Sequence, residues 1–380
     1  MVREFALKIC FVANDAYGAL VGDGQGHIGG VERQTALMAR WLADRGHAVS
    51  VATWTEGAAT DENINGIRVL KICPADAGLP GLRFVHPRWT ALNAALARAD
   101  ADLYYQNCAE SVTGQVALWA KRHGRQFVYS VASDPECDPT LPILHSFRER
   151  WLYRRGLTLA DRVIAQTRHQ QQLLKSGFGL TSTVLPMPSE VLSNESLDTL
   201  EAARPALPSV LWIGRLMPVK NVALFLDIAD RLPGITFNLV GGIDQDPVYA
   251  EAMLARARSQ SNMRVHGKLD RGAVLAQIRS SHILCCTSDY EGFPNTFLEA
   301  WAHGMPVVST VDPDGLLQDR ALGRRGSDAN CLAAQLQSLV TDARVRKQMS
   351  HNAWDYYYAN HHMTGVMPRF EALFKELLAS

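Results

Sequence analysis

The chain lacks any excess of charge, since 38 lysines and arginines balance 38 aspartates and glutamates over 380 residues. A protein that wraps nucleic acid needs a surplus of cations to neutralise phosphates, so this balance argues against that class. The seven cysteines include no Cys-x-x-Cys pair, and their spacing gives no indication of a zinc site. Several of them lie in apolar runs, as reduced core cysteines do, which predicts a reducing compartment.

The chain also lacks an apolar run of membrane-spanning length, a recognisable signal peptide, short-period repeats and low-complexity tracts. We therefore expect a cytoplasmic protein. The basic and aromatic segment 147–155 leaves open a peripheral contact with the inner face of the membrane, although a helix with inward aromatics and solvated arginines is the simpler interpretation.

Short apolar runs alternate with longer amphipathic stretches, a pattern typical of α/β proteins with parallel sheets and crossover helices. A polar segment at 191–208 interrupts the pattern, which then restarts. We expect one Rossmann-like domain at 1–190, a linker at 191–208, a second Rossmann-like domain at 209–362 and a C-terminal helix within 363–380. The strands expected on this basis are 7–13, 48–53, 67–72, 102–105, 127–132, 162–165, 183–185, 210–214, 237–240, 264–266, 283–287 and 307–309.

Two glutamates, Glu291 and Glu299, flank a turn between the apolar run 282–287 and a helix expected at 297–303. Asn295 is well suited to cap that helix, and a helix N-terminus after a strand favours phosphate. Glu299 lies one turn below, where the ribose of a bound nucleotide diphosphate would lie, and Glu291 could reach an attached sugar. The alternative is a strand–loop–helix with two solvated glutamates. The turn that would add backbone N–H groups is Gly292, Phe293, Pro294, Asn295 and Thr296.

A second motif follows the strand that opens the second half of the chain. Gly214 ends this strand, and Arg215 and Lys220 stand five residues apart across a turn that contains a proline. Arginine offers a planar fork for phosphate oxygens and lysine a mobile point charge, so the pair could neutralise a departing diphosphate without a metal. As an alternative, Arg215 covers the sheet edge and Lys220 is solvated.

Together these motifs resemble the E-x7-E and G-R-x4-K signatures of retaining GT-B glycosyltransferases of family 4. The resemblance implies two Rossmann-like domains that face each other across a cleft, the first (1–190) on the acceptor side and the second (209–362) binding the nucleotide sugar, with the C-terminal helix returning to the first domain. It implies transfer of a hexosyl unit from a nucleotide diphosphate sugar, UDP- or GDP-linked, to a glycan or lipid-linked acceptor in polysaccharide or glycoconjugate biosynthesis. The configuration would be retained and no metal cofactor would be needed. Arg215, Lys220 and Glu291 would then be catalytic.

The same resemblance assigns further donor contacts. The segment His266, Gly267, Lys268 and Leu269 is similar to one whose backbone lines the pocket for the base. Gly29 and Gly30 end a glycine-rich loop before a helix, where backbone can approach a phosphate closely. His27 in that loop could contact the acceptor, although a lone histidine in a loop is more often only exposed.

Two positions leave the chemistry open. Many family members carry a histidine near Asn107, and an asparagine there can hydrogen bond to a sugar but cannot exchange a proton. Asp134, Glu136 and Asp138 follow the fifth strand; Asp134 is the candidate to orient the acceptor hydroxyl, and a metal site is the weaker alternative. A sugar-nucleotide epimerase, a phosphorylase and a non-catalytic sugar-nucleotide-binding protein remain alternatives.

Overall fold

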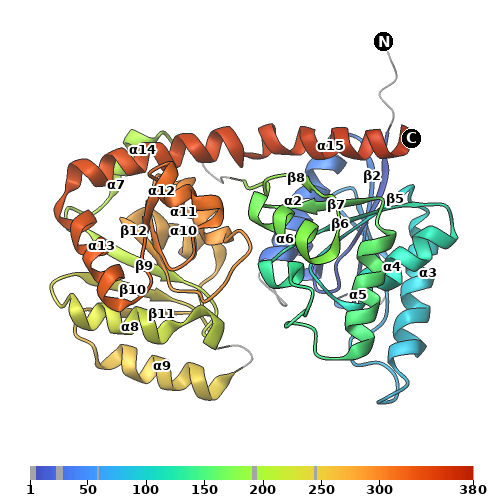
Figure 1. Cartoon of the computed structure of the whole chain (residues 1–380), viewed down its shortest axis with the longest axis horizontal. Coiled ribbons are helices and arrows are strands. Elements are labelled where there is room, and N and C mark those ends of the chain that lie inside the picture. Colours follow the sequence, from blue (N-terminus) through green and yellow to red (C-terminus); the bar gives the residue numbers. More distant parts are fainter. Residues whose placement is uncertain (1–5, 23–28, 58–59, 191–194, 244–245, 380) are drawn as a thin grey trace, which may run out of the picture. The chain divides into compact units, whose positions relative to one another are not determined.

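The computed structural model describes residues 6–22, 29–57, 60–190, 195–243 and 246–379. The chain forms two compact units, residues 1–190 together with 363–380 and residues 191–362. Figure 1 shows a twisted sheet flanked by helices in each of them.

Unit 1 contains one eight-stranded sheet in the order β3-β4-β2-β1-β5-β6-β7-β8. Neighbouring strands are parallel, except that β3 pairs with β4 in the antiparallel sense. The elements are β1 (Lys8–Val12), α1 (Tyr17–Val21), α2 (Gly30–Asp44), β2 (Ala48–Thr53), β3 (Glu62–Ile64), β4 (Ile67–Lys71), η1 (Phe84–Trp89), α3 (Thr90–Ala99), β5 (Leu103–Asn107), α4 (Ser111–Arg122), β6 (Gln126–Ser130), η2 (Asp134–Cys137), α5 (Phe147–Leu159), β7 (Arg162–Ala165), α6 (Arg168–Phe178), β8 (Thr183–Val184) and α15 (Met363–Ala379).

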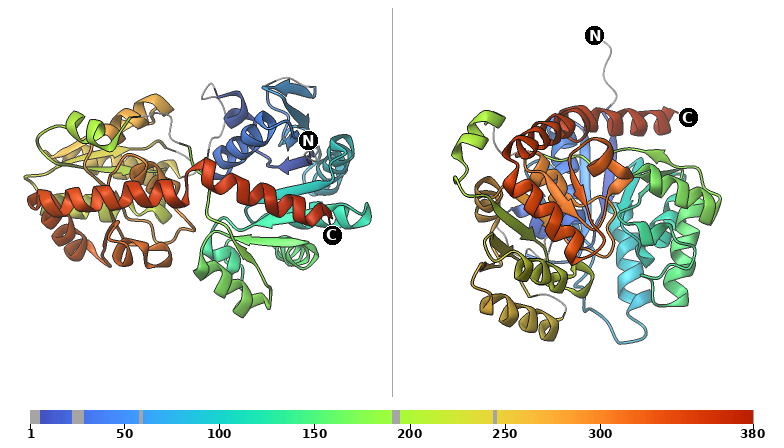
Figure 2. Two further views of the ribbon diagram at one scale, coloured as in Figure 1. Left: turned by 90° about the horizontal axis from the view of Figure 1, so that it is seen from above. Right: turned by 60° about the vertical axis from the view of Figure 1, so that its left-hand side comes forward.

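The two faces of this sheet support two separate cores, because successive side chains of a strand point to opposite faces. On one face, Phe11 packs in a cluster with residues of α2 and α15, among them Met38 and Phe370. On the other face, Cys10 packs with residues of α3, α4 and α5. The C-terminal helix therefore completes the core of unit 1, and Figure 2 shows it lying along this unit.

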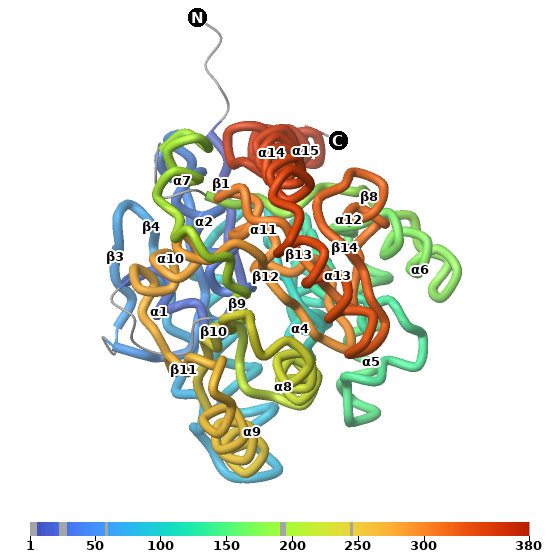
Figure 3. The backbone as a smooth tube through the Cα atoms, turned by 90° about the vertical axis from the view of Figure 1, so that its left-hand side faces the viewer, coloured from blue at the N-terminus to red at the C-terminus, as the bar shows by residue number. Residues whose placement is uncertain are grey.

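Unit 2 contains a six-stranded parallel sheet in the order β11-β10-β9-β12-β13-β14. One face packs against α8, α9 and α13, with Phe225 and Phe237 fully buried between them. Figure 3 faces this unit and shows helices on both sides of its strands. The elements are α7 (Leu197–Ala203), β9 (Ser209–Ile213), η3 (Pro218–Lys220), α8 (Val222–Arg231), β10 (Thr236–Val240), α9 (Pro247–Ser259), β11 (Met263–Gly267), α10 (Arg271–Ser280), β12 (Ile283–Cys286), α11 (Asn295–Trp301), β13 (Val307–Ser309), η4 (Pro313–Gly315), α12 (Leu316–Asp319), β14 (Gly323–Arg325), α13 (Ala329–Thr341) and α14 (Ala343–Asn360).

The prediction of two parallel-sheet α/β domains agrees with this architecture. Two three-residue edge strands, β3 and β14, were not predicted, because such short runs carry no periodic signal. Part of the segment expected to be a linker forms α7, which begins at Leu197 after the capping side chain of Ser196. Leu197 and Leu200 of this helix are buried, so α7 packs as part of unit 2.

Candidate functional site

The strand order of unit 2 places a switch point between β9 and β12. From β9 the chain continues to β10 and β11 on one side, and from β12 to β13 and β14 on the other. In open parallel sheets, the crevice at the carboxyl ends of such a strand pair is where ligands bind. Gly214 follows β9 and Thr287 follows β12, so both predicted motifs of this unit begin at that point.

The loops after β9 and β12 are tied to each other by hydrogen bonds. The Thr287 hydroxyl donates to the Lys220 carbonyl at 2.9 Å, and the Asp289 N–H donates to the Val219 carbonyl at 2.9 Å. The Asn221 amide donates to the Asp289 carboxylate at 3.0 Å. Asn221 also caps α8 by accepting from the Leu224 N–H at 3.2 Å. The position of Lys220 is therefore fixed by the backbone of the β12 loop.

The Lys220 ammonium donates to Glu291 Oε1, which brings two predicted catalytic residues into direct contact. The Ser288 hydroxyl donates to the same carboxylate oxygen at 2.6 Å. The side chains of Lys220 and Glu291 are 24% and 18% exposed, so both can be reached from solvent. An arriving anion would compete with Glu291 for the lysine, and this would release a carboxylate to accept hydrogen bonds from hydroxyls.

Glu299 lies on α11 and is only 11% exposed in its side chain. Its carboxylate accepts a hydrogen bond from the Arg271 guanidinium at the first position of α10. This ion pair joins α10, which carries the arginine, to α11, which carries the glutamate. Glu291 and Glu299 thus have different cationic partners, and neither is a freely solvated glutamate.

The expectation that Asn295 caps α11 is wrong, because Asn295 is the first helical residue and Pro294 occupies the capping position without a side-chain bond. A proline with its fixed φ is suited to the entrance of a helix, so the helix begins two residues earlier than expected. Phe293 is buried, with its ring 4.8 Å from that of His361 and 6.0 Å from that of Trp301. Gly292 and Pro294 are also buried, whereas Thr296 is partly exposed.

The predicted segments Gly214–Arg215 and 266–269 meet through the loop after β10. The Gly214 N–H donates to the Val240 carbonyl at 3.1 Å, and the Gly241 N–H donates to the Gly267 carbonyl at 3.0 Å. A Cβ on Gly241 would lie 2.1 Å from the Gly214 carbonyl oxygen, so only glycine permits this approach. Arg215 is exposed beside it.

His266 lies at the end of this row of loops and hydrogen bonds through Nε2 to the Asn238 carboxamide at 3.0 Å. Burial lowers the pKa of His266, and Arg264 lowers it further. The ring is therefore held neutral and positioned by Asn238. Gly267 has a φ of 72°, a conformation that favours glycine. Lys268 is exposed and Leu269 is partly exposed.

Unit 1 has its own switch point, between β1 and β5. Gly29 caps α2 and Gly30 is its first residue. Asn107 ends β5 and is buried, and its amide donates to the Gln34 carboxamide of α2 at 3.2 Å. These three residues, which were predicted to contact the donor, thus belong to elements that meet at the carboxyl ends of β1 and β5. His27 lies outside the described residues.

The three carboxylates after β6 do not converge on one another, and each has hydrogen-bond partners of its own. Glu136 is fully buried and accepts from the Tyr129 hydroxyl at 2.6 Å, the Ala132 N–H at 3.1 Å and the Ser133 hydroxyl at 3.0 Å. Asp138 accepts from Thr140 at 2.7 Å. Asp134 accepts from the Gln170 amide at 3.1 Å, and His169 Nε2 lies 4.0 Å from its other oxygen.

Glu136 is expected to make the free energy of unfolding depend on pH. Burial raises the pKa of Glu136 from an ordinary value of 4.5 to about 7. Between these values only the folded state holds the proton, so the free energy of unfolding falls by up to about 1.4 kcal/mol per pH unit as pH rises, and the loss is complete above the folded pKa.

We expect Glu136→Gln, which mimics the protonated acid, to flatten the part of the pH dependence that Glu136 contributes. Urea unfolding at a series of pH values from 4.5 to 8 measures it. Burial also raises the pKa of Glu110 to about 7, so Glu110→Gln is the matched comparison. A Glu136→Gln profile parallel to that of the wild type would show that Glu136 is ionised in the folded state.

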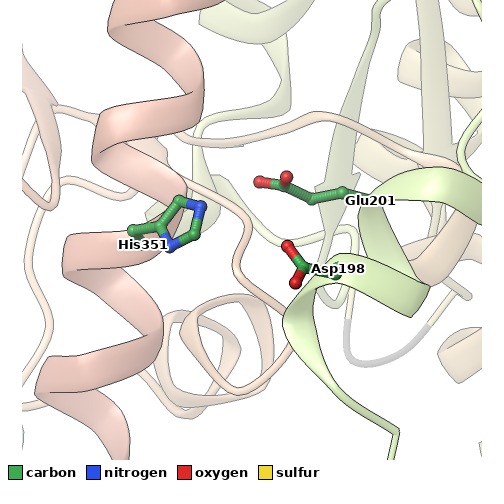
Figure 4. Close-up of side chains that lie close together, drawn as sticks. All are labelled: Asp198, Glu201 and His351. Carbon is green, nitrogen blue, oxygen red and sulfur yellow. The ribbon is translucent and has the colours of Figure 1, made fainter.

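Among the described residues, one group of potential metal ligands lies within 4.8 Å of one another, namely Asp198, Glu201 and His351. Figure 4 shows His351 projecting from α14 toward the two carboxylates on α7. Lys347 Nζ lies 3.4 Å from Glu201, so a cation already faces this carboxylate. The group lies on helices rather than at the strand-end loops, and we assign no metal to it.

Both units are Rossmann-like α/β domains, and each gathers polar residues at the switch point of its sheet. Residues 29–187 match a family described as a glycosyl transferase 4-like domain, and residues 207–342 match the family glycosyl transferases group 1. The chain belongs to the group 1, family 4 glycosyltransferases.

Individual relatives are distant. The chain is 25% identical over 206 residues to an amylovoran biosynthesis glycosyltransferase, AmsD, of Erwinia amylovora, covering 52% of this chain and 57% of that protein. It is 27% identical over 158 residues to a lipopolysaccharide core biosynthesis glycosyltransferase, LpsE, of Rhizobium meliloti, covering 38% of this chain and 42% of that protein. The aligned region therefore spans about half the length of these curated relatives.

A solved structure, a sucrose-phosphate synthase from Thermosynechococcus elongatus, aligns with a TM-score of 0.79 at 18% identity over 98% of this chain and 99% of that one. The alignment confirms the predicted GT-B fold. Within the described residues, no helix combines the length and the apolar character that a bilayer crossing requires.

Several residues at these edges were not predicted from the sequence. Arg271 and Ser288 contact the two glutamates, and Asp289 joins the two loops through Asn221. Ser288 and Asp289 could have been considered, since they directly precede Glu291. Arg271 lies 28 residues before Glu299, and no local pattern connects the two.

Proposed function

We propose that the protein transfers a hexosyl unit from a nucleotide diphosphate sugar to an acceptor hydroxyl, with retention of configuration and without a divalent metal. The observation that carries this proposal is the contact of Lys220 with Glu291 at the switch point of unit 2. In this proposal Lys220 binds the phosphates of the donor and Glu291 binds hydroxyls of its sugar. The names of the curated relatives support an acceptor in polysaccharide or lipopolysaccharide synthesis.

The role of each residue follows from its charge and position. Lys220 and Arg215 bind the diphosphate and stabilise the charge that develops as the bond between the anomeric carbon and the phosphate oxygen breaks. The acceptor oxygen forms the new bond to the same face of the anomeric carbon, and its proton passes to the departing diphosphate. Glu291, released from Lys220, holds the transferred sugar, and Glu299 holds the ribose. The proposal leaves Asp134 to orient the acceptor.

The remaining donor contacts come from backbone. The N–H groups at the start of α11 face a phosphate in the proposed complex, and the loop 266–269 borders the base. A neutral His266, held by Asn238, adds no charge beside the base. Both UDP- and GDP-sugars fit this scheme, and stabilisation against heat by each nucleotide sugar distinguishes them.

Retention is the outcome that tests the reaction. We expect the first-formed glycoside to keep the anomeric configuration of the donor, because attack and departure occur on one face. Proton NMR of the product measures the anomeric coupling, which reports the configuration of the new glycosidic bond. An inverted product would contradict the assignment of Glu291 and Lys220, whereas donor binding without any product would indicate a sugar-nucleotide-binding protein.

A further inference from the structure

A cavity of about 280 Å³ lies wholly within unit 1, at the carboxyl ends of β1, β2 and β5. Asn14 follows β1, Trp54 follows β2, and Glu110 follows β5, and all three line the cavity. The cavity therefore lies at the switch point of the first sheet, where a parallel α/β domain binds ligands. None of the residues assigned above to the donor lines it.

The polar part of the lining is held in place. The Asn14 amide donates to Glu110 Oε2 at 2.9 Å. The Asn14 carbonyl accepts from the Thr53 hydroxyl at 2.6 Å and from the Trp54 N–H at 2.8 Å. Asn14 and Glu110 therefore form a fixed hydrogen-bonding pair, joined to the backbone of Trp54.

The apolar part of the lining includes two aromatic rings, Trp54 and Phe84, and buried side chains such as Leu92. The Arg88 guanidinium lies 5.8 Å from the centre of the Trp54 ring. Its Nε is buried and, among the described residues, has no hydrogen-bond partner. The lining thus offers aromatic surface, a carboxylate and a carboxamide, with the Arg88 guanidinium beside Trp54.

The charge around Glu110 decides which ligands fit. Burial, with smaller contributions from the carboxylates of Asp15 and Glu32, raises the pKa of Glu110 to about 7. A phosphate or uronate brought beside these three carboxyl groups would add a like charge, which is unfavourable and which the Arg88 guanidinium of the lining offsets only in part. A neutral ligand with hydroxyl groups meets no such penalty and can hydrogen bond to Glu110 and Asn14.

We propose that this cavity is a subsite for one neutral pyranoside ring, whose hydroxyls bind Glu110 and Asn14 and whose C–H face packs on Trp54. The volume matches a single ring, since sites for larger ligands occupy about 300–1,000 Å³. That the ring belongs to the acceptor rests on the proposed function. The binding itself does not.

Binding of methyl glycosides tests the subsite without any donor. Saturation-transfer NMR and calorimetric titration with methyl glucoside, galactoside and mannoside should show binding to the wild-type protein by at least one of them. Glucose 6-phosphate should bind roughly tenfold more weakly than methyl glucoside, or not at all. Glu110→Ala and Trp54→Leu should each weaken glycoside binding roughly tenfold, the effect of losing one charge-assisted hydrogen bond or an aromatic face.

Trp151→Leu is the matched control, because Trp151 is an exposed tryptophan of α5 outside the cavity. Circular dichroism of each variant shows whether the fold persists, and Glu110→Gln covers the case in which Glu110→Ala fails to fold. Glutamine keeps an oxygen that can accept from the Asn14 amide and from a sugar hydroxyl, so Glu110→Gln should retain glycoside binding. Because it is uncharged, the difference in affinity between methyl glucoside and glucose 6-phosphate should become smaller.

The proposal is overturned if no neutral glycoside binds, if the cavity variants bind as the wild type does, or if the phosphorylated sugar binds best. Failure of the proposed function has a different signature. In that case glycoside binding would still depend on Glu110 and Trp54, while no transfer to any glycoside would occur.

Discussion

Replacing Lys220 with alanine lowers the transfer rate about a hundredfold, the scale for removing one group that stabilises developing charge. The lysine contacts Glu291 at the switch point, and the β12 loop fixes its backbone. Alanine has no charge with which to replace the ammonium beside Glu291. Steady-state transfer rates at saturating donor measure the loss, and Arg215→Ala should behave alike.

The fold of these variants should persist. Lys220 lies in a turn after a strand, and its partner Glu291 keeps the hydrogen bond from the Ser288 hydroxyl in the variant, so the free energy of unfolding should fall only slightly. Lys347→Ala is the matched control, since it removes another partly exposed ion pair, with Glu201, away from the strand-end loops. It should leave both the rate and the melting temperature near those of the wild type.

Excess EDTA should leave the wild-type rate nearly unchanged if cations of the protein stabilise the diphosphate. Loss of activity in EDTA with recovery on adding manganese would contradict this and would favour a metal site at Asp134 and Asp138. An unchanged rate for Lys220→Ala would remove the second cation from the proposed mechanism.

Much of the fold could be predicted because strands buried on both faces produce continuous apolar runs. The strands 48–53, 162–165 and 307–309 have the predicted bounds. Short edge strands such as Glu62–Ile64 gave no signal, since an edge strand half exposed to solvent needs no apolar run. At α11 the local rule for capping failed. Pro294 stands at the N-cap, so Asn295 is the first residue inside the helix.

The candidate site was predictable in its motifs but not in its pairings. The sequence places Lys220 and Glu291 in two separate loops, 71 residues apart, and only the order of the strands brings them together. The cavity of unit 1 is a stronger example, because Asn14 and Glu110 are 96 residues apart and neither belongs to a recognisable motif. Pairings of this kind depend on tertiary structure, which local periodicity does not encode.

Glu299→Ala should weaken nucleotide binding by roughly ten- to a hundredfold, the value of one or two hydrogen bonds to a charged group. Its carboxylate is nearly buried and held by Arg271, so it is positioned before a ribose arrives. Calorimetric titration with UDP and GDP measures the loss. Glu251→Ala, at an exposed position of α9, is the control and should leave binding unchanged.

Variants of Arg271 test whether this residue positions Glu299 for the nucleotide or only forms a structural ion pair with it. If Arg271 holds Glu299 in place, Arg271→Ala should weaken nucleotide binding by less than Glu299→Ala does. The double variant should then be no weaker than Glu299→Ala alone, because residues in direct contact are not additive. Fully additive losses would mean that Arg271 contacts the nucleotide independently. Unchanged affinity for Glu299→Ala would reduce the pair to a helix–helix contact within unit 2, and the ribose would need another partner.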